Sequence, residues 1–218
     1  MPSEDPHREA EIFHAGADIL SASSVMLLLH GRGASAEDIL GLGQELAPRE
    51  MALIAPQASG NTWYPHSFLS PISQNEPWLS SALRLVETLV QQCLAGGIAS
   101  ERLIICGFSQ GACLGTEFVA RHPRRYAALL TFTGGLIGPP GSDLHHTGTL
   151  DGVWALFSSG DPDPHVPWTR VEESARQFRG MGAQVQLERH PGRPHTILPQ
   201  EVSAARNLVK QIFLRYKP

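Results

Sequence analysis

Ser109 lies at the centre of a Gly-Phe-Ser-Gln-Gly sequence at residues 107–111, a spacing that is typical of a serine nucleophile. Small residues two positions before and after the serine let neighbouring backbones cross in a sharp strand-to-helix turn without colliding. Such a turn leaves the serine hydroxyl free above the sheet and aims the first helical amides at the same point. The motif therefore predicts acyl-transfer chemistry. The alternative is a glycine turn with an incidental serine.

A serine hydroxyl needs a base, and the base needs a carboxylate that orients it. Asp161 and Asp163 follow a strand expected at 153–159, and His195 follows a strand expected at 184–190. The order serine, carboxylate, histidine is the one found with a G-x-S-x-G turn. Position alone leaves both aspartates open as the orienting group.

Other histidines could compete for a role in chemistry. His190 is closer to the strand body and is expected to be a partly buried structural residue, and His165 is expected to line the loop that carries the acid. His145-His146 and the pair of His190 and His195 lack a third ligand at a recognisable metal-binding spacing. We therefore expect no metal and no cofactor.

A Leu-His-Gly-Arg-Gly sequence at residues 29–33 supplies candidates for stabilising an oxyanion. Acyl transfer places negative charge on a carbonyl oxygen, and each fixed donor to it lowers the barrier by roughly 2.7–4 kcal/mol. One donor is the amide after the nucleophile, that of Gln110, and the other comes from the turn after an earlier strand. The amide of Arg32 fits the second position, and its guanidinium is expected to face solvent or an acidic partner.

Residues 31–36 offer a competing interpretation. They read Gly-Arg-Gly-Ala-Ser-Ala, which matches the G-x-G-x-x-A fingerprint of dinucleotide-binding folds. That fingerprint requires an acidic residue at the end of the next strand, where this chain has Pro56 and Gln57. Dinucleotide binding would also leave the candidate serine, aspartate and histidine without a role, so acyl transfer is favoured.

The elements that must position these residues alternate along the chain. Short apolar runs predict strands at 11–17, 25–30, 51–57, 103–108, 127–133, 153–159 and 184–190. Helical apolar spacing predicts helices at 35–47, 80–94, 110–121, 169–181 and 199–214. This order indicates an α/β fold with a mainly parallel, twisted sheet of about seven strands and helices on both faces. Ligands of such sheets bind at the carboxyl ends of the strands, where the candidate residues lie.

The 218 residues suit one domain spanning 1–218, with residues 1–10 as a flexible N-terminus. A net charge of −4 leaves no basic excess for a phosphate backbone, so nucleic acid is not an expected partner. The apolar run at 25–29 is far shorter than the ~20 residues that span a bilayer, and the polar N-terminus resembles no secretory signal. We expect a cytoplasmic protein without a membrane span. Three cysteines without a C-x-x-C spacing argue against a disulfide framework.

Long irregular stretches at 58–78 and 134–152 are expected to be functional loops. The first carries Trp63, Tyr64 and Phe68, which could shape an acyl or aryl pocket. Packing of this loop onto the body is the alternative. The predicted elements and loops use nearly the whole chain, so no inserted cap domain is expected.

Taken together, the motifs resemble the phospholipase/carboxylesterase family of α/β-hydrolases, which includes acyl-protein thioesterases and small bacterial carboxylesterases. The resemblance runs from about residue 24 to the C-terminus. It rests on residues 29–33, the Trp-Tyr pair at 63–64, residues 107–111, the acid motif at 160–167 and a Gly-x-x-His motif at 192–195. It implies an α/β-hydrolase fold with no separate cap domain.

The resemblance also implies roles for individual residues. The family's acid lies three residues before the valine of a Val-Pro pair, which selects Asp163 over Asp161 as the partner of His195 and Ser109. The family's oxyanion amides correspond to Arg32 and Gln110. Acyl-protein thioesterases have a leucine at the Arg32 position, so this chain is more similar to the bacterial carboxylesterase branch.

The resemblance implies a serine hydrolase that cleaves carboxylic esters, or thioesters, of small or medium acyl groups through an acyl-enzyme. The expected substrate contacts are Trp63, Tyr64, Phe68 and Val166, and the expected partner is a small-molecule ester. An exposed edge strand or apolar loop could support a homodimer. A dienelactone-type hydrolase would carry a cysteine at the position of Ser109. The remaining alternative is a non-catalytic ligand-binding protein on a hydrolase scaffold, which has no physical need for all three triad residues.

Overall fold

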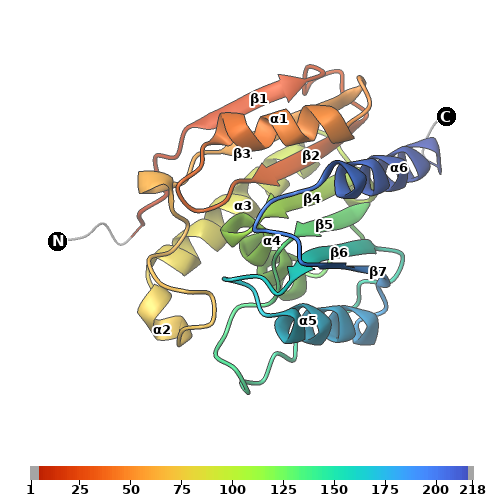
Figure 1. The fold of residues 1–218 in the computed structure, drawn as a ribbon. Coiled ribbons are helices and arrows are strands. Elements are labelled where there is room, and N and C mark those ends of the chain that lie inside the picture. Colours follow the sequence, from red (N-terminus) through yellow and green to blue (C-terminus); the bar gives the residue numbers. More distant parts are fainter. Residues whose placement is uncertain (1–4, 216–218) are drawn as a thin grey trace.

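A seven-stranded sheet forms the centre of the computed structural model, which describes residues 5–215 (Figure 1). Its strand order is β1-β3-β2-β4-β5-β6-β7, with β1 antiparallel to β3 and every other pair parallel. The strands are β1 Ile12–Gly16, β2 Ser24–Leu29, β3 Met51–Pro56, β4 Leu103–Phe108, β5 Ala128–Phe132, β6 Trp154–Asp161 and β7 Gln184–Pro191. The expected seven-stranded, mainly parallel sheet is thus confirmed.

Helices cover both faces of this sheet (Figure 1). Strand β2 shows why, because alternate residues on it enter different apolar cores. Val25, Leu27 and Leu29 pack with α3 (Trp78–Ala95), α4 (Gln110–Arg121) and α5 (Trp168–Gly180). Met26 and Leu28 pack with α1 (Ala36–Leu46) and α6 (Pro199–Arg215). A strand buried on both faces must be apolar throughout, which explains the continuous run that β2 shows in the sequence.

The 58–78 segment is more ordered than a structureless loop. It contains a 3-10 turn at Ser59–Asn61 and the short helix α2, Ile72–Asn75. The buried amide of Asn75 accepts a hydrogen bond from the His66 amide at 2.9 Å and donates one to the Ser67 carbonyl at 3.0 Å. A side chain therefore replaces the backbone ladder that an irregular segment lacks.

The 134–152 segment is held in a similar way by Arg170 of α5. This buried guanidinium donates to the carbonyls of Leu136 at 2.9 Å, Gly138 at 2.7 Å and Pro139 at 3.0 Å. A further 3-10 turn at Ser100–Arg102 precedes β4. Over residues 5–215, the segments between the strands hold these helices and turns and no inserted cap domain.

The start of the described chain packs against the 58–78 segment and α3. His7 is buried, its amide donates to Ser81 Oγ at 2.9 Å, and its ring contacts Trp78. Its Nδ1 accepts from the Ser59 amide at 3.2 Å, so its Nε2 donates to the Trp63 carbonyl at 3.0 Å. An imidazole with both nitrogens bonded thus anchors residues 5–10 to the body, and flexibility of the N-terminus stays a prediction. Residues 1–4 lie outside the described residues.

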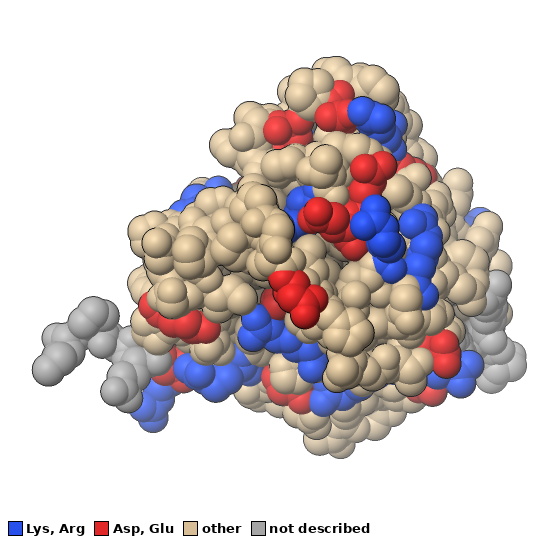
Figure 2. Space-filling model, turned by 90° about the horizontal axis from the view of Figure 1, so that it is seen from below, with Lys and Arg blue, Asp and Glu red and all other residues tan. Residues whose placement is uncertain are grey.

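The described surface is mixed in charge where Figure 2 views it. Acidic and basic side chains are interspersed on the face seen from below, which includes α5 and the 134–152 segment. Within the described part of the chain, none of the helices has the length and apolar character needed to cross a membrane.

Candidate active site

Ser109 occupies the turn between β4 and α4 with φ +54° and ψ −117°. This is an uncommon conformation for a residue with a side chain, and it persists only where the surroundings impose it. The Ser109 amide donates to the Phe132 carbonyl at the end of β5, at 2.9 Å. A Cβ on Gly107 would collide with the backbone of Gly111, and one on Gly111 would collide with the carbonyl of Leu29. Both glycines of the motif are therefore required by the crossing of β2, β4 and α4.

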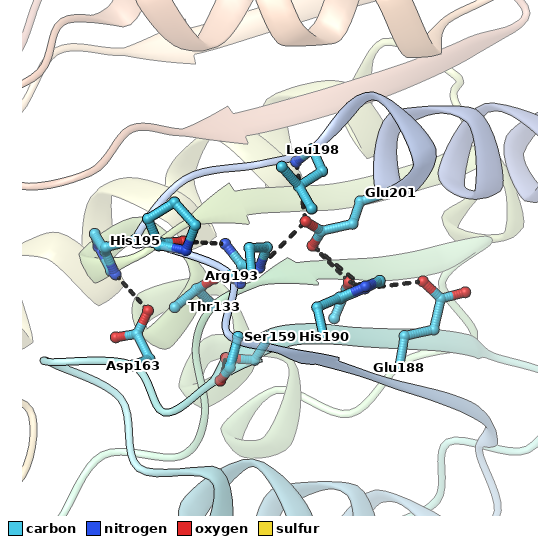
Figure 3. Close-up of polar contacts among 12 residues, drawn as sticks. Thr133, Ser159, Asp163, Glu188, His190, Arg193, His195, Leu198 and Glu201 are labelled. Carbon is cyan, nitrogen blue, oxygen red and sulfur yellow. Dashed lines mark hydrogen bonds and ion pairs between the residues drawn. The ribbon is translucent and has the colours of Figure 1, made fainter.

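A chain of hydrogen bonds joins the serine, the histidine and one aspartate. The Oγ of Ser109 donates to Nε2 of His195 at 2.9 Å, and Nδ1 of His195 donates to Oδ2 of Asp163 at 2.8 Å. Figure 3 shows the His195–Asp163 contact at the ends of two adjacent loops. The other carboxylate oxygen of Asp163 accepts the amides of His165 at 2.9 Å and Val166 at 3.0 Å.

The surroundings of Asp163 set its charge. Its side chain has no exposed surface, and burial raises its pKa. The hydrogen bonds from His165, His195 and Val166 together act more strongly, so the pKa of Asp163 lies below its ordinary value. The carboxylate is therefore ionised at neutral pH, and Nδ1 of His195 keeps its proton. The lone pair on Nε2 is left to receive a proton from Ser109.

The structure separates the two aspartates that the sequence left open. Asp161 ends β6, and its Oδ2 accepts a hydrogen bond from Nε of Arg189 on the neighbouring strand at 2.6 Å. It is thereby tied to the sheet edge, while Asp163 reaches His195. His190 is half-buried with its Nε2 2.9 Å from Ser158 Oγ, and the ring of His165 lies edge-on to that of His195.

The turns that carry Arg32 and Gln110 lie next to each other because β2 and β4 are neighbouring strands. Gln110 is the first residue of α4, where a backbone amide has no partner inside the helix. Its side chain accepts from the Trp63 amide at 2.9 Å and donates to the Tyr64 carbonyl at 2.8 Å. Gln110 thus also fixes the segment that covers the site.

The Arg32 side chain is exposed to solvent, as one of the two expected alternatives has it. Its guanidinium also donates to the carbonyls of Pro65 at 2.7 Å and His66 at 2.6 Å. These carbonyls belong to an irregular segment without a ladder of its own, and a fork of donors satisfies both. The Arg32 side chain therefore ties the 58–78 segment to the turn after β2.

A cavity of about 440 Å³ opens above Ser109. Of the expected substrate contacts, Tyr64, Phe68 and Val166 line it. Trp63 does not, because its side chain is fully buried in the core and its Nε1 donates to the His30 carbonyl at 2.8 Å. The other lining residues are Arg32, Pro65, His66, Ser67, Ser109, Gln110, Cys113, His165 and His195.

Comparison with known proteins identifies the group to which the site belongs. The family model described as Phospholipase/Carboxylesterase matches residues 11–213. The chain belongs to this family. A crystal structure of a phospholipase/carboxylesterase from Dyadobacter fermentans is 42% identical, with 93% of this chain and 97% of that chain covered and a TM-score of 0.89. The resemblance and the α/β-hydrolase fold expected from the sequence are both confirmed.

More distant relatives of this phospholipase/carboxylesterase family member indicate the bond that it cleaves. Acyl-protein thioesterase 1 of Eremothecium gossypii is 28% identical over 223 residues, covering 90% of this chain and 91% of its own length. A probable carboxylesterase SOBER1-like protein of Arabidopsis thaliana is 26% identical over 211 residues, covering 87% and 79%. The chain is therefore a hydrolase of esters or thioesters of the α/β-hydrolase type.

Some residues of the hydrolase's site were missed in the sequence. Cys113 lines the cavity one helical turn after Ser109, and an i, i+4 spacing along α4 could have identified it. Burial raises the pKa of its thiol to about 12, so it is a neutral wall of the cavity. Among residues 5–215, no three His, Cys, Asp or Glu side chains are placed to hold a metal ion.

Proposed function

We propose that this hydrolase cleaves carboxylic esters or thioesters of small or medium acyl groups through a Ser-His-Asp triad and an acyl-enzyme. The observation that carries the proposal is the unbroken chain of hydrogen bonds from Ser109 through His195 to Asp163. Each member has the partner that its role requires, since the serine faces a free imidazole lone pair and the imidazole faces an ionised carboxylate.

In the proposed reaction, Ser109 Oγ attacks the carbonyl carbon while its proton passes to Nε2 of His195. The amides of Arg32 and Gln110 would hold the resulting oxyanion. Collapse of the tetrahedral intermediate breaks the bond to the leaving alcohol or thiol, which takes the proton from His195. Water then attacks the acyl-enzyme with His195 as base, and the acid and free Ser109 are released.

The cavity supports the choice of acyl size. Its volume of about 440 Å³ falls near the lower part of the ~300–1,000 Å³ range of small-molecule sites. Tyr64, Phe68 and Val166 supply apolar lining, whereas Arg32, His66 and His165 bring polar groups to its walls. We propose hydrolysis of acetyl to medium-chain esters in preference to palmitoyl esters.

The test is intact-mass analysis after treatment with a fluorophosphonate, on the wild-type chain and on Ser109→Ala. One adduct on the wild type and none on the variant would support the proposal. Ser203→Ala removes a serine from the exposed face of α6 and should keep the adduct. A folded wild type without an adduct would overturn the proposal and favour a non-catalytic scaffold. A panel of acetyl to palmitoyl esters and thioesters then defines the substrate.

A further inference from the structure

The turn that carries His195 is anchored by a buried cation. Arg193 is 3% exposed and lies two residues before His195 (Figure 3). Its guanidinium donates to Oγ1 of Thr133 at 2.5 Å and to the Pro194 carbonyl at 3.1 Å. Its Nε lies 3.3 Å from Oε2 of Glu201 in an ion pair that lacks hydrogen-bond geometry. None of these groups has a part in the proposed chemistry.

Glu201, in the first turn of α6, has no exposed surface and is fully engaged. Its Oε1 accepts from Ser158 Oγ at 2.6 Å, and its Oε2 accepts from the Leu198 amide at 2.9 Å. The Ser158 hydroxyl already donates its hydrogen bond to Glu201. Nε2 of His190, which lies 2.9 Å from the hydroxyl oxygen, therefore donates to it. The carboxylate therefore joins the start of α6 to β6 and β7 (Figure 3).

The Arg193 guanidinium also contacts the segment that holds the turn of Ser109. Thr133 receives the Arg193 guanidinium and donates its own amide to the Ser158 carbonyl at 2.7 Å. The residue before it, Phe132, accepts the Ser109 amide at 2.9 Å. The backbone at 132–133 thus holds the serine turn on one side and the histidine turn on the other.

The end of β6 is shaped to receive this turn. A Cβ on Gly160 would lie 2.7 Å from the Arg193 carbonyl oxygen, so the close approach requires glycine there. The Gly192 amide donates to the Asp161 carbonyl at the end of β6 at 3.0 Å. Within the turn itself, the Arg193 amide donates to the His190 carbonyl at 3.3 Å and the Thr196 amide to the Pro194 carbonyl at 2.7 Å. A Gly/Pro-rich turn with this little internal bonding needs an external support to fix a side chain.

We propose that Arg193, held by Glu201, is a positioning residue that keeps Nε2 of His195 within hydrogen-bond reach of Ser109. The inference rests on the proposed function, because it assigns a task to groups around the same triad. A buried ion pair contributes little net stability compared with apolar residues of the same volume, since desolvation offsets its attraction. It does set geometry, and a misplacement of about 1 Å in an active site can cost roughly 100-fold in rate.

The test compares Arg193→Met, Arg193→Lys and Glu201→Gln with the wild type in kcat, KM and rate of fluorophosphonate labelling. We expect Arg193→Met to lower kcat and the labelling rate by about 10- to 100-fold, with KM within about twofold. Arg193→Lys keeps the charge but cannot reach Thr133 and Glu201 together, so it should restore part of the loss. The kcat and labelling rate of Glu201→Gln should lie between those of Arg193→Met and Arg193→Lys.

Arg124→Met is the matched control. Arg124 is partly buried and pairs bidentately with Glu87 of α3, between elements remote from the triad. Its removal should lower the thermal midpoint without changing kcat. If Arg193→Met and Arg193→Lys lose no more activity than this control, the positioning role is wrong. If the wild type neither labels nor hydrolyses esters, the proposed function itself has failed.

Discussion

Asp163 and Asp161 are separated by one residue but differ in side-chain exposure and in hydrogen-bond partners. Asp163 has no exposed surface and accepts two backbone amides besides the His195 ring. Asp161 pairs with Arg189, whose side chain is 56% exposed, so the strength of that ion pair is screened by solvent. At the residue scale, an orienting carboxylate is defined by the donors that hold it rather than by its place along the chain.

Substitution of each aspartate by asparagine provides a matched pair. Asp163→Asn keeps the shape but can present an amide donor to His195, which selects the wrong tautomer. A loss in kcat of about 10⁴-fold is expected, as for this change in other serine triads. Asp161→Asn should change kcat by less than about threefold, because surface ion pairs contribute little. Steady-state hydrolysis of one ester checks both variants, and similar losses would contradict the assignment.

Arg32 is a second residue-scale case, because its side chain holds a neighbouring segment while its backbone amide is proposed to bind the oxyanion. Arg32→Met keeps the amide but removes the two hydrogen bonds to Pro65 and His66. The segment lining the cavity should loosen, raising KM about tenfold for a loss of ~1.4 kcal/mol in binding while kcat stays within about threefold. Kinetics on a medium-chain ester measure the split, and a selective fall in kcat would contradict it.

Helix α1 approaches the sheet closely at a position occupied by glycine. In α1, Gly43 faces β2 and β3, and a Cβ there would lie 2.5 Å from Cδ1 of Leu28 and 3.3 Å from that of Leu53. Gly41, two residues earlier and exposed, has no atom within 4 Å of such a Cβ. Substituting each of these glycines by alanine therefore distinguishes the effect of helix propensity from the effect of packing within one helix.

At the element scale, Gly41→Ala should raise the free energy of unfolding by about 0.5–1 kcal/mol, because alanine restricts the unfolded chain. Gly43→Ala gains the same propensity but overpacks the core, which typically costs ~1–3 kcal/mol, so a net loss is expected. Urea unfolding of both variants gives the comparison. An equal gain from both would show that α1 moves away from the sheet without cost.

At the scale of the whole molecule, the free energy of unfolding depends on pH because two histidines are buried. Burial lowers the pKa of His7 and of His30, even though hydrogen bonds to the carbonyls of Trp63 and Gly31 oppose the shift. The unfolded chain, with an ordinary histidine pKa of ~6.5, then binds more protons than the folded chain below that pH. Stability should therefore fall as the pH drops below about 6.5 toward the folded pKa values, and be fully present above it.

Urea unfolding at pH 7.5, 6 and 5 would measure this loss, with these buffers chosen to span the histidine range of about 5–8. His7→Gln removes one titrating group, so the free energy of unfolding of this variant should depend less steeply on pH than that of the wild type. Equal slopes would mean that His7 does not couple protons to folding.

The association state and location of the molecule stay predictions. Strand β1 lies at the edge of the sheet and Leu20 nearby is 94% exposed, which are features that a homodimer could use. Light scattering on the purified chain measures the mass directly. The single-domain organisation and the cytoplasmic location likewise stay predictions made from the sequence.

The sequence by itself determined the strands, the longer helices and the turn that carries Ser109. Continuous apolar runs and helical spacing predicted the strands and helices, with ends that shift by one or two residues, as when α3 begins at Trp78 instead of residue 80. The glycines at 107 and 111 predicted the serine turn. These features depend on neighbours along the chain, because backbone conformation and the period of burial are set locally.

Only the tertiary structure decided which side chains meet. It turned Trp63 into the core and bound Arg32 to carbonyls of another segment. It also paired Arg193 with Glu201 and placed His7 against Trp63. Each of these contacts joins residues that are apart in the chain, and their geometry follows from how whole elements pack. Local residue types do not carry that information, since the same side chain can face a core, a cavity or solvent.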